Sequence, residues 1–146
     1  MPDLPEPRDL IGRTTPHREL VIDQRQVRDF LDAIGEASPP FAPGSSSRRF
    51  GSPILPPTIW SVVRPGGDPE VAVPRYGTGL NAGNAYRCAQ PAQAGEALKR
   101  QTRIADAYQR EGRTGKLTFF VFETTITRPG GEVVATTRSS SVQRGG

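Results

Sequence analysis

The chain has 146 residues, of which 34% are hydrophobic, and this size predicts one domain with a single core rather than two domains. The mean hydropathy is −0.51, and no apolar run approaches the ~20 residues of a membrane helix, which argues against a membrane-spanning protein. Nineteen basic residues against 15 acidic ones give a net charge of +4, and all but two of the basic residues are arginine.

The basic residues favour a phosphate-bearing ligand, because a guanidinium group donates two parallel hydrogen bonds to a phosphate. They are spread along the chain without interleaved aromatic residues, so we expect no nucleic-acid binding. A phosphorylated carrier such as coenzyme A is another possible ligand, and a high-GC genome would also enrich arginine without any ligand. The single cysteine, Cys88, excludes an internal disulfide and a cysteine-based metal site. The N-terminus lacks the pattern of a secretory signal. We therefore expect a cytoplasmic protein without a metal or cofactor.

The first third of the chain predicts an arm, a strand and a helix. Residues 1–16 contain four prolines and no apolar periodicity, which predicts an extended arm before a single domain of residues 17–146. A short strand is expected at Glu19–Ile22, and a helix should begin after an N-cap at Asp23 and end at Gly35. The apolar residues that recur at helical spacing are Val27, Phe30, Leu31 and Ile34.

The middle of the chain predicts loops around one short helix. Residues 36–57 contain six prolines and three consecutive serines, which is typical of a loop. Two prolines directly before an apolar run mark a helix entrance, so we expect a buried helix at Thr58–Val63. Residues 64–79 are again rich in glycine and proline and predict a second loop.

The second half of the chain predicts strands. The candidates are residues 80–89, residues 96–112, and two strands within 115–144 that the sequence RPGG joins as a hairpin. In the longest strand Leu98, Ile104 and Tyr108 have the same parity and should share a face. An antiparallel meander of about four strands packed on a helix is an α+β fold. Its edge strands should pair with a second copy or a sister subunit.

Several motifs in this order resemble the MaoC-type acyl dehydratases, specifically their amino-terminal or fatty-acid-synthase-like (FAS1-like) dehydratase branch. The stretches are VRDFLDAIGEASPPF, GSPILPPTIW, LNAGNAY and the run from QPAQAGEAL to SSSVQR, and the resemblance spans Leu10 to Arg144. It implies the hot-dog fold, in which an antiparallel sheet wraps a long central helix, here containing Thr58–Val63, and in which two such units pair as a double hot dog. Members of this family hydrate or dehydrate an enoyl or 3-hydroxyacyl thioester of coenzyme A or acyl carrier protein.

The catalytic loop departs from the pattern of this family. Active hydratases carry a Gly-Asp-x-Asn-Pro-aliphatic-His sequence whose Asp and His hold and activate water. The resemblance places GEASPPF on it, with Glu36 at the Asp position, Ser38 at the Asn position and Phe41 at the His position. A phenylalanine cannot transfer a proton, and such transfer typically contributes about 10²–10⁴-fold in rate.

The helix entrance departs as well. Active members offer a backbone N–H there to polarise the thioester carbonyl, whereas Pro56 and Pro57 have none and only Thr58 and Ile59 remain as donors. Phe41 and Trp60 are candidates for the wall of the acyl tunnel, although Trp60 also suits a core. Arginines near the loop and helix are candidate coenzyme A phosphate contacts. The expected substrate-binding set is Phe41, Arg48, Arg49, Pro56, Pro57, Thr58, Ile59, Trp60 and Arg64.

These departures predict a non-catalytic, specificity-setting subunit of a heteromeric enoyl-thioester hydratase, inactive alone and paired with a chain that has the intact Asp/His motif. One alternative is a homodimeric hydratase or thioesterase with Glu36 as its base. Another is a stand-alone acyl-CoA-binding protein. The only histidine, His17, is expected at the surface or at a strand end, and Cys88 is expected as a small buried apolar residue.

Overall fold

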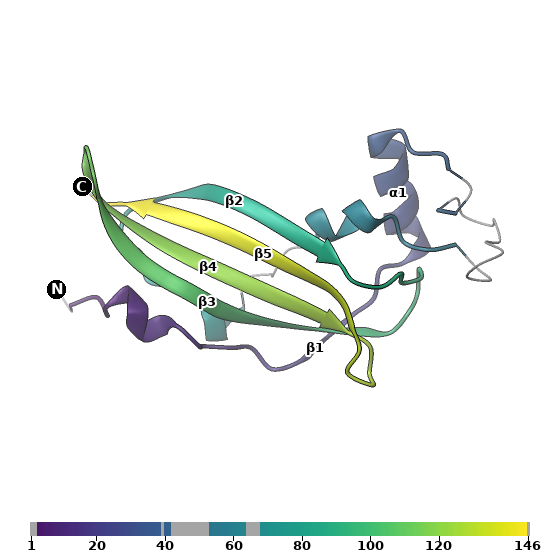
Figure 1. Ribbon diagram of the computed structural model, residues 1–146, viewed down its shortest axis with the longest axis horizontal. Coiled ribbons are helices and arrows are strands. Elements are labelled where there is room, and N and C mark those ends of the chain that lie inside the picture. The colour runs from purple at the N-terminus through teal and green to yellow at the C-terminus, as the bar shows by residue number, and fades with distance from the viewer. Residues whose placement is uncertain (1–2, 39, 42–52, 64–67, 146) are drawn as a thin grey trace.

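A computed structural model describes residues 3–38, 40–41, 53–63 and 68–145 of the chain (Figure 1). Its main feature is a five-stranded antiparallel sheet in the order β1-β3-β4-β5-β2. The strands are β1 (Arg18–Leu20), β2 (Thr78–Cys88), β3 (Leu98–Gly112), β4 (Gly115–Thr127) and β5 (Val133–Arg144), the α-helix is α1 (Gln24–Ile34), and the 3₁₀ helices are η1 (Pro7–Leu10), η2 (Pro57–Ser61) and η3 (Pro69–Val71). The predicted α+β class is confirmed.

The predicted hairpin lies between β4 and β5. Its turn is closed by a hydrogen bond from the Arg128 N–H to the Glu132 carbonyl, 2.9 Å long. Gly131 has φ of +93° there, a conformation that residues with a Cβ rarely adopt. The Arg128 side chain donates to Glu96, Gln90 and the Pro91 carbonyl, which fastens the turn to the segment between β2 and β3.

The prediction that Tyr108 shares a face with Leu98 and Ile104 is wrong, because β3 contains a β-bulge. Ile104 pairs with Phe122, but the next paired residue is Asp106, so Ala105 is an extra residue in this strand. The extra residue inverts the alternation of side chains beyond it. Ile104 therefore shares the inner face with Leu98, whereas Tyr108 lies on the outer face and stacks on Phe119 with ring centroids 4.9 Å apart.

Helix α1 begins and ends where the sequence predicted. The Asp23 carboxylate accepts from the Gln26 N–H, and the Gln26 side chain accepts from the Asp23 N–H, which is a complete capping box. Gly35 ends the helix in the left-handed conformation with φ of 69°. Val27 and Leu31 are buried, and α1 lies beyond one end of the sheet rather than along it (Figure 1).

The segment predicted as an extended arm is partly helical and packs on the sheet. It forms η1, and Leu10 at the end of η1 is fully buried beside Ile104 and Phe120. The following residues run along β3, with hydrogen bonds from the Gly12 N–H to the Ile104 carbonyl and from the Thr15 N–H to the Thr102 carbonyl. Burial of Leu10 and this added edge pairing explain why the segment does not stay apart from the domain.

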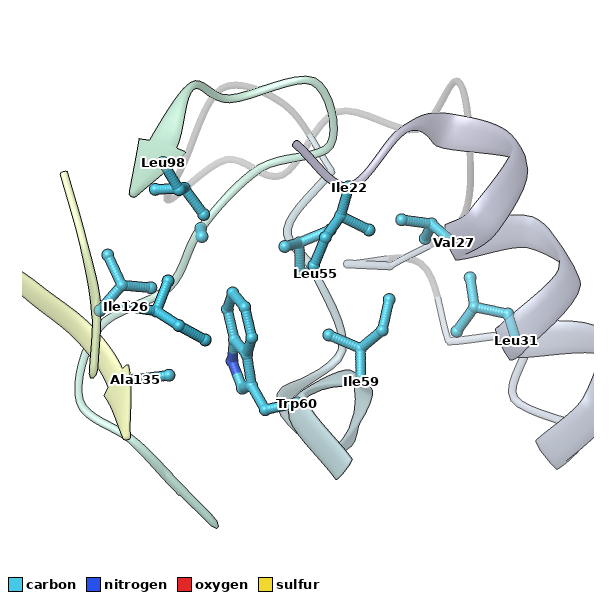
Figure 2. Close-up of a cluster of buried hydrophobic side chains, with 11 residues drawn as sticks. Ile22, Val27, Leu31, Leu55, Ile59, Trp60, Leu98, Ile126 and Ala135 are labelled. Carbon is cyan, nitrogen blue, oxygen red and sulfur yellow. The ribbon is translucent and has the colours of Figure 1, made fainter. Parts of the chain in front are cut away.

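The larger hydrophobic cluster lies at the end of the sheet near α1 (Figure 2). Trp60 of η2 has an exposed fraction of 1% and packs among Leu98, Ile126 and Ala135 from the sheet. On its other side Figure 2 shows residues from the loop, from η2 and from α1, namely Leu55, Ile59, Ile22, Val27 and Leu31. This cluster joins α1 and the loop segment at residues 53–57 to the sheet.

The expected long central helix is reduced, in the described residues, to the five residues of η2. The predicted helix at Thr58–Val63 is therefore a 3₁₀ turn, which extends one residue earlier and ends at Ser61. Two prolines at its start and the Gly-rich stretch soon after it leave too few residues for a longer α-helix. In the part of the chain that the structure describes, no helix is long and apolar enough to cross a membrane.

An ion-pair cluster attaches the segment around η3 to β1 and β3. The largely buried Asp68 carboxylate lies 2.9 Å from the Arg18 guanidinium and 3.0 Å from that of Arg100. Arg18 also binds Glu70 at 2.9 Å. Because this segment leads into β2, the cluster helps to position the start of that edge strand.

Candidate functional site

Glu36, which the sequence resemblance aligns with the hydratase Asp, lies just after α1. Its side chain accepts a hydrogen bond from the Ser38 N–H at 2.8 Å. Hydrogen bonds from the Ser38 hydroxyl and backbone N–H lower the pKa of the Glu36 carboxyl below its ordinary value of 4.5. A carboxylate held in this way is a weaker base than a free one, so its local contacts oppose its use in proton abstraction.

Phe41, which the sequence resemblance aligns with the hydratase His, packs against the core. It is half-buried and packs against the larger hydrophobic cluster. A hydrogen bond from its N–H to the Ser38 carbonyl, 3.1 Å long, closes the turn, and the Ile54 N–H donates to the Pro40 carbonyl at 2.9 Å. These two hydrogen bonds hold Phe41 and Pro40 in place, and the side chain at position 41 is apolar.

The helix entrance offers fewer donors than the sequence suggested. Pro56 is buried and Pro57 is exposed, and neither has an N–H. The Ile59 N–H, one of the two expected donors, is bonded to the Pro56 carbonyl at 2.9 Å. The Thr58 carbonyl accepts from the Ser61 hydroxyl, and a donor role for the Thr58 N–H stays a prediction.

A hollow of about 230 Å³ opens between η2 and the start of α1. Ile59 lines it, together with apolar side chains from β1 and from the end of η2. The lining residues are Leu20, Val21, Ile22, Gln26, Ile59, Val62 and Val63. Val21 and Val62 are at least half exposed, so this apolar wall reaches the surface.

The structure brings only some of the predicted residues together. Phe41, Ile59 and Trp60 meet in or against one hydrophobic cluster. Arg48, Arg49 and Arg64 lie outside the described residues. His17 is at the surface as expected. Cys88 is exposed rather than buried, because it lies at the end of the edge strand β2, all of whose residues are exposed.

A second surface was not predicted from the sequence. We call it the β5–β2 groove, and its side chains are Thr137, Ser139, Ser141, Asn81, Asn84 and Tyr86. The signal was present in the run TTRSSS at residues 136–141, which is polar at every position. In an ordinary half-buried strand every second residue would be apolar, as it is around Phe120 and Phe122 in β4.

Comparison with known families places the chain. The family model described as FAS1-like, dehydratase domain region, matches residues 9–137. A search of curated proteins finds no significant match.

Solved structures with the same fold include proteins from several bacteria. A chain of the ChsH1-ChsH2 complex from Mycobacterium tuberculosis is 18% identical over 90% of this chain and 89% of that one, with a TM-score of 0.71. A chain of the HadBC (3R-hydroxyacyl-ACP dehydratase) complex from Mycobacterium tuberculosis is 17% identical over 93% and 98%, with a TM-score of 0.67. The R-hydratase PhaJ1 from Pseudomonas aeruginosa is 13% identical over 93% and 83%, with a TM-score of 0.61.

The likeness to these structures confirms the predicted hot-dog fold, although in the described residues the five-residue η2 stands where a long helix was expected. The match of the family model covers most of the chain, from the buried end of η1 to the middle of β5. The chain therefore belongs to the family described as the FAS1-like dehydratase domain region.

Proposed function

We propose that this protein is a non-catalytic subunit of a heteromeric enoyl-thioester hydratase or dehydratase, in which a sister chain with an intact Asp/His motif carries out the proton transfers. The observation that carries the proposal is the pair Glu36 and Phe41. The Glu36 carboxylate accepts a hydrogen bond from Ser38 and has a lowered pKa. Phe41 is an apolar side chain packed on the core. In this loop the described residues contain no acid–base pair that would act near neutral pH.

The edge strand β2 supports a protein partner. Each of its 11 residues, Thr78–Cys88, is exposed, and its outer edge is unpaired within the described chain. Long exposed edges are covered in most proteins, because their free N–H and C=O groups pair with other chains. Two of the fold relatives are described as complexes of two different chains. Pairing through β2 would place Trp60 and the β5–β2 groove near the partner.

The ligand would be an acyl thioester of coenzyme A or acyl carrier protein. The apolar hollow beside Ile59 and the cluster around Trp60 provide an apolar wall for an acyl group. In the pair of chains, this subunit would shape the tunnel, while its partner would supply the water-activating residues.

A direct test measures hydration of crotonyl-CoA by the loss of enoyl absorbance. The chain alone should give no turnover above the uncatalysed rate, and Glu36→Gln should leave this result unchanged. Co-expression with a hot-dog chain that has the intact Asp/His loop should give one stable complex with activity. Turnover by the chain alone that Glu36→Gln abolishes would support the homodimeric alternative and refute the proposal.

A thioesterase would be recognised by a different product. Hydrolysis releases a free thiol, which a colorimetric thiol reagent detects, whereas hydration does not. We expect no thiol release, because the lowered pKa of Glu36 makes it a poor base. A stand-alone binding protein would bind acyl-CoA but would form no complex with any intact hot-dog chain.

A further inference from the structure

The β5–β2 groove is a polar channel on the inner face of the sheet. It consists of two adjoining hollows of about 160 and 320 Å³ that share Ser139. The first lies against Trp60 and Ser61 of η2. The second continues along the same strands toward Gln143. Together they extend from the apolar cluster at Trp60 toward the opposite end of the sheet.

The strand register places the polar side chains of the groove on one face. Thr137, Ser139 and Ser141 are alternate residues of β5 and pair with Thr124, Phe122 and Phe120, which face the inside. On the other side they pair with the β2 residues Tyr86, Asn84 and Asn81. Side chains two residues apart on a strand are about 7 Å apart. The groove is therefore a regular row of hydroxyl and amide groups.

The hydroxyl groups of Thr137 and Ser139 differ from other polar groups on the inner face, because no described residue forms a side-chain hydrogen bond with them. Thr102 and Thr124 share a hydrogen bond of 2.7 Å, and Gln143 accepts from the Tyr76 N–H at 2.6 Å. Thr137 and Ser139, in contrast, make no side-chain hydrogen bond to any described residue and are only half exposed. Polar groups in such a position favour a ligand that can bond to them.

The groove is open because the helix above it is short. Of the described residues outside the sheet, Trp60 and Ser61 alone line it. An aliphatic acyl chain in the groove would displace the water bound to these hydroxyl groups. The hydroxyl groups would then lose their hydrogen bonds to water and gain none, which costs free energy. An acyl group with its own oxygen atoms would replace them.

We propose that the β5–β2 groove binds the distal part of an acyl group that carries hydroxyl or keto oxygens, with Trp60 as the flat wall at its inner end. This inference rests on the proposed function, because it assumes that the ligand is an acyl thioester. It assigns Thr137, Ser139 and Asn84 as specificity-determining residues. Sites built to bond a substrate hydroxyl discriminate strongly against the analogue that lacks it.

Binding to the purified full chain tests the proposal. The probes are 12-hydroxydodecanoyl-CoA and dodecanoyl-CoA, which have the same carbon chain and differ in one hydroxyl. Trp60 is the only tryptophan, so its fluorescence reports occupancy next to the groove, and calorimetry gives an independent Kd. We expect the hydroxylated probe to bind roughly five- to tenfold more tightly, the effect of about one hydrogen bond.

Matched variants on one strand locate the effect. Thr137→Val and Ser139→Ala should each bring the ratio of the two Kd values close to one. Thr136→Val is the control, because Thr136 is the neighbouring residue on the outer face of β5, and it should keep the wild-type ratio. Circular dichroism of all three should show the same fold.

The outcomes separate the two proposals. Equal Kd values for both probes, or a preference that Thr137→Val and Ser139→Ala leave intact, would overturn the groove as an oxygen-binding site and leave acyl-thioester binding standing. Binding of neither probe would overturn the proposed function together with this inference.

Discussion

At the scale of single residues, the chemistry of the loop depends on what surrounds Glu36 and Phe41. A glutamate at an Asp position would retain a base if its carboxylate were free. Here Ser38 occupies that carboxylate, and the pKa is lowered rather than raised toward neutrality. Phe41 contributes to the core instead of to proton transfer. Under the proposed function, the loop around these two residues would form a wall of the acyl tunnel.

Removing the Ser38 hydroxyl should return the pKa of the Glu36 carboxyl toward 4.5, because this hydrogen bond is the largest cause of its shift. Ser38→Ala is the variant, and carboxyl NMR during a pH titration is the measurement. Since the folded-state pKa is lowered, the stabilising effect is present above pH 4.5 and is lost as the pH falls through the folded value. An unchanged midpoint in Ser38→Ala would show that the hydroxyl is not the cause.

At the scale of elements, the ion pairs of the fold differ in how much they should stabilise it. The Asp68 carboxylate forms ion pairs with the guanidinium groups of Arg18 and Arg100, and the Arg100 side chain is 17% exposed. The pair Arg25–Asp29 on α1 spans 3.9 Å and is largely exposed. Burial makes the first cluster a structural clamp, whereas solvent screens the second.

Asp68→Asn should therefore lower the free energy of unfolding by roughly 2 kcal/mol, less than a fully buried pair would cost because Arg18 is 36% exposed. The matched control is Asp29→Asn, for which we expect a change below about 0.5 kcal/mol. Urea unfolding followed by circular dichroism measures both. Equal effects of the two variants would show that burial of the cluster adds no stability.

The N-terminal cap of α1 gives a third measurable contribution. Asp23→Ala removes the acceptor for the Gln26 N–H and breaks the capping box. We expect a loss of about 1 kcal/mol, since the amide at the helix start is left without its partner. Thermal unfolding gives the value, and Asp23→Asn, which keeps the acceptor, should retain most of the stability.

At the scale of the whole molecule, the exposed edge strand β2 is the main feature that suggests a protein partner. The sheet ends on β2, whose residues are all exposed and whose outer edge is unpaired in the described chain, and Leu80 and Tyr86 are large apolar residues at its surface. The short η2 leaves the neighbouring inner face open as well. A partner at β2 would cover the edge and close the groove into a tunnel.

Tyr86→Asp should weaken assembly at least tenfold, because a charge at a packed interface must lose its hydration. Val133→Asp is a suitable control, since Val133 is 41% exposed against 45% for Tyr86 and lies next to the hairpin turn, outside the residues of β5 that pair with β2. Analytical ultracentrifugation of the chain, alone and with its co-expressed partner, measures the effect. If Val133→Asp disrupts assembly and Tyr86→Asp does not, the interface lies elsewhere.

The sequence alone determined the elements whose signals are local. The capping residues and periodicity of α1 and the RPGG hairpin predicted their structures because short-range hydrogen bonds and backbone preferences decide them. The placement of Glu36 and Phe41 on the hydratase motif stays a prediction from the order of residues. Burial of Trp60 was anticipated from the apolar run around it.

The tertiary structure decided what depends on distant contacts. The bulge at Ala105 moved Tyr108 to the outer face, and the packing of Leu10 on β3 turned an expected arm into part of the core. The row formed by Thr137, Ser139 and Asn84 exists only because β5 and β2 pair in one register, and it is open only because η2 is short. A sequence gives the side chains of such a groove, but only the folded sheet sets them side by side.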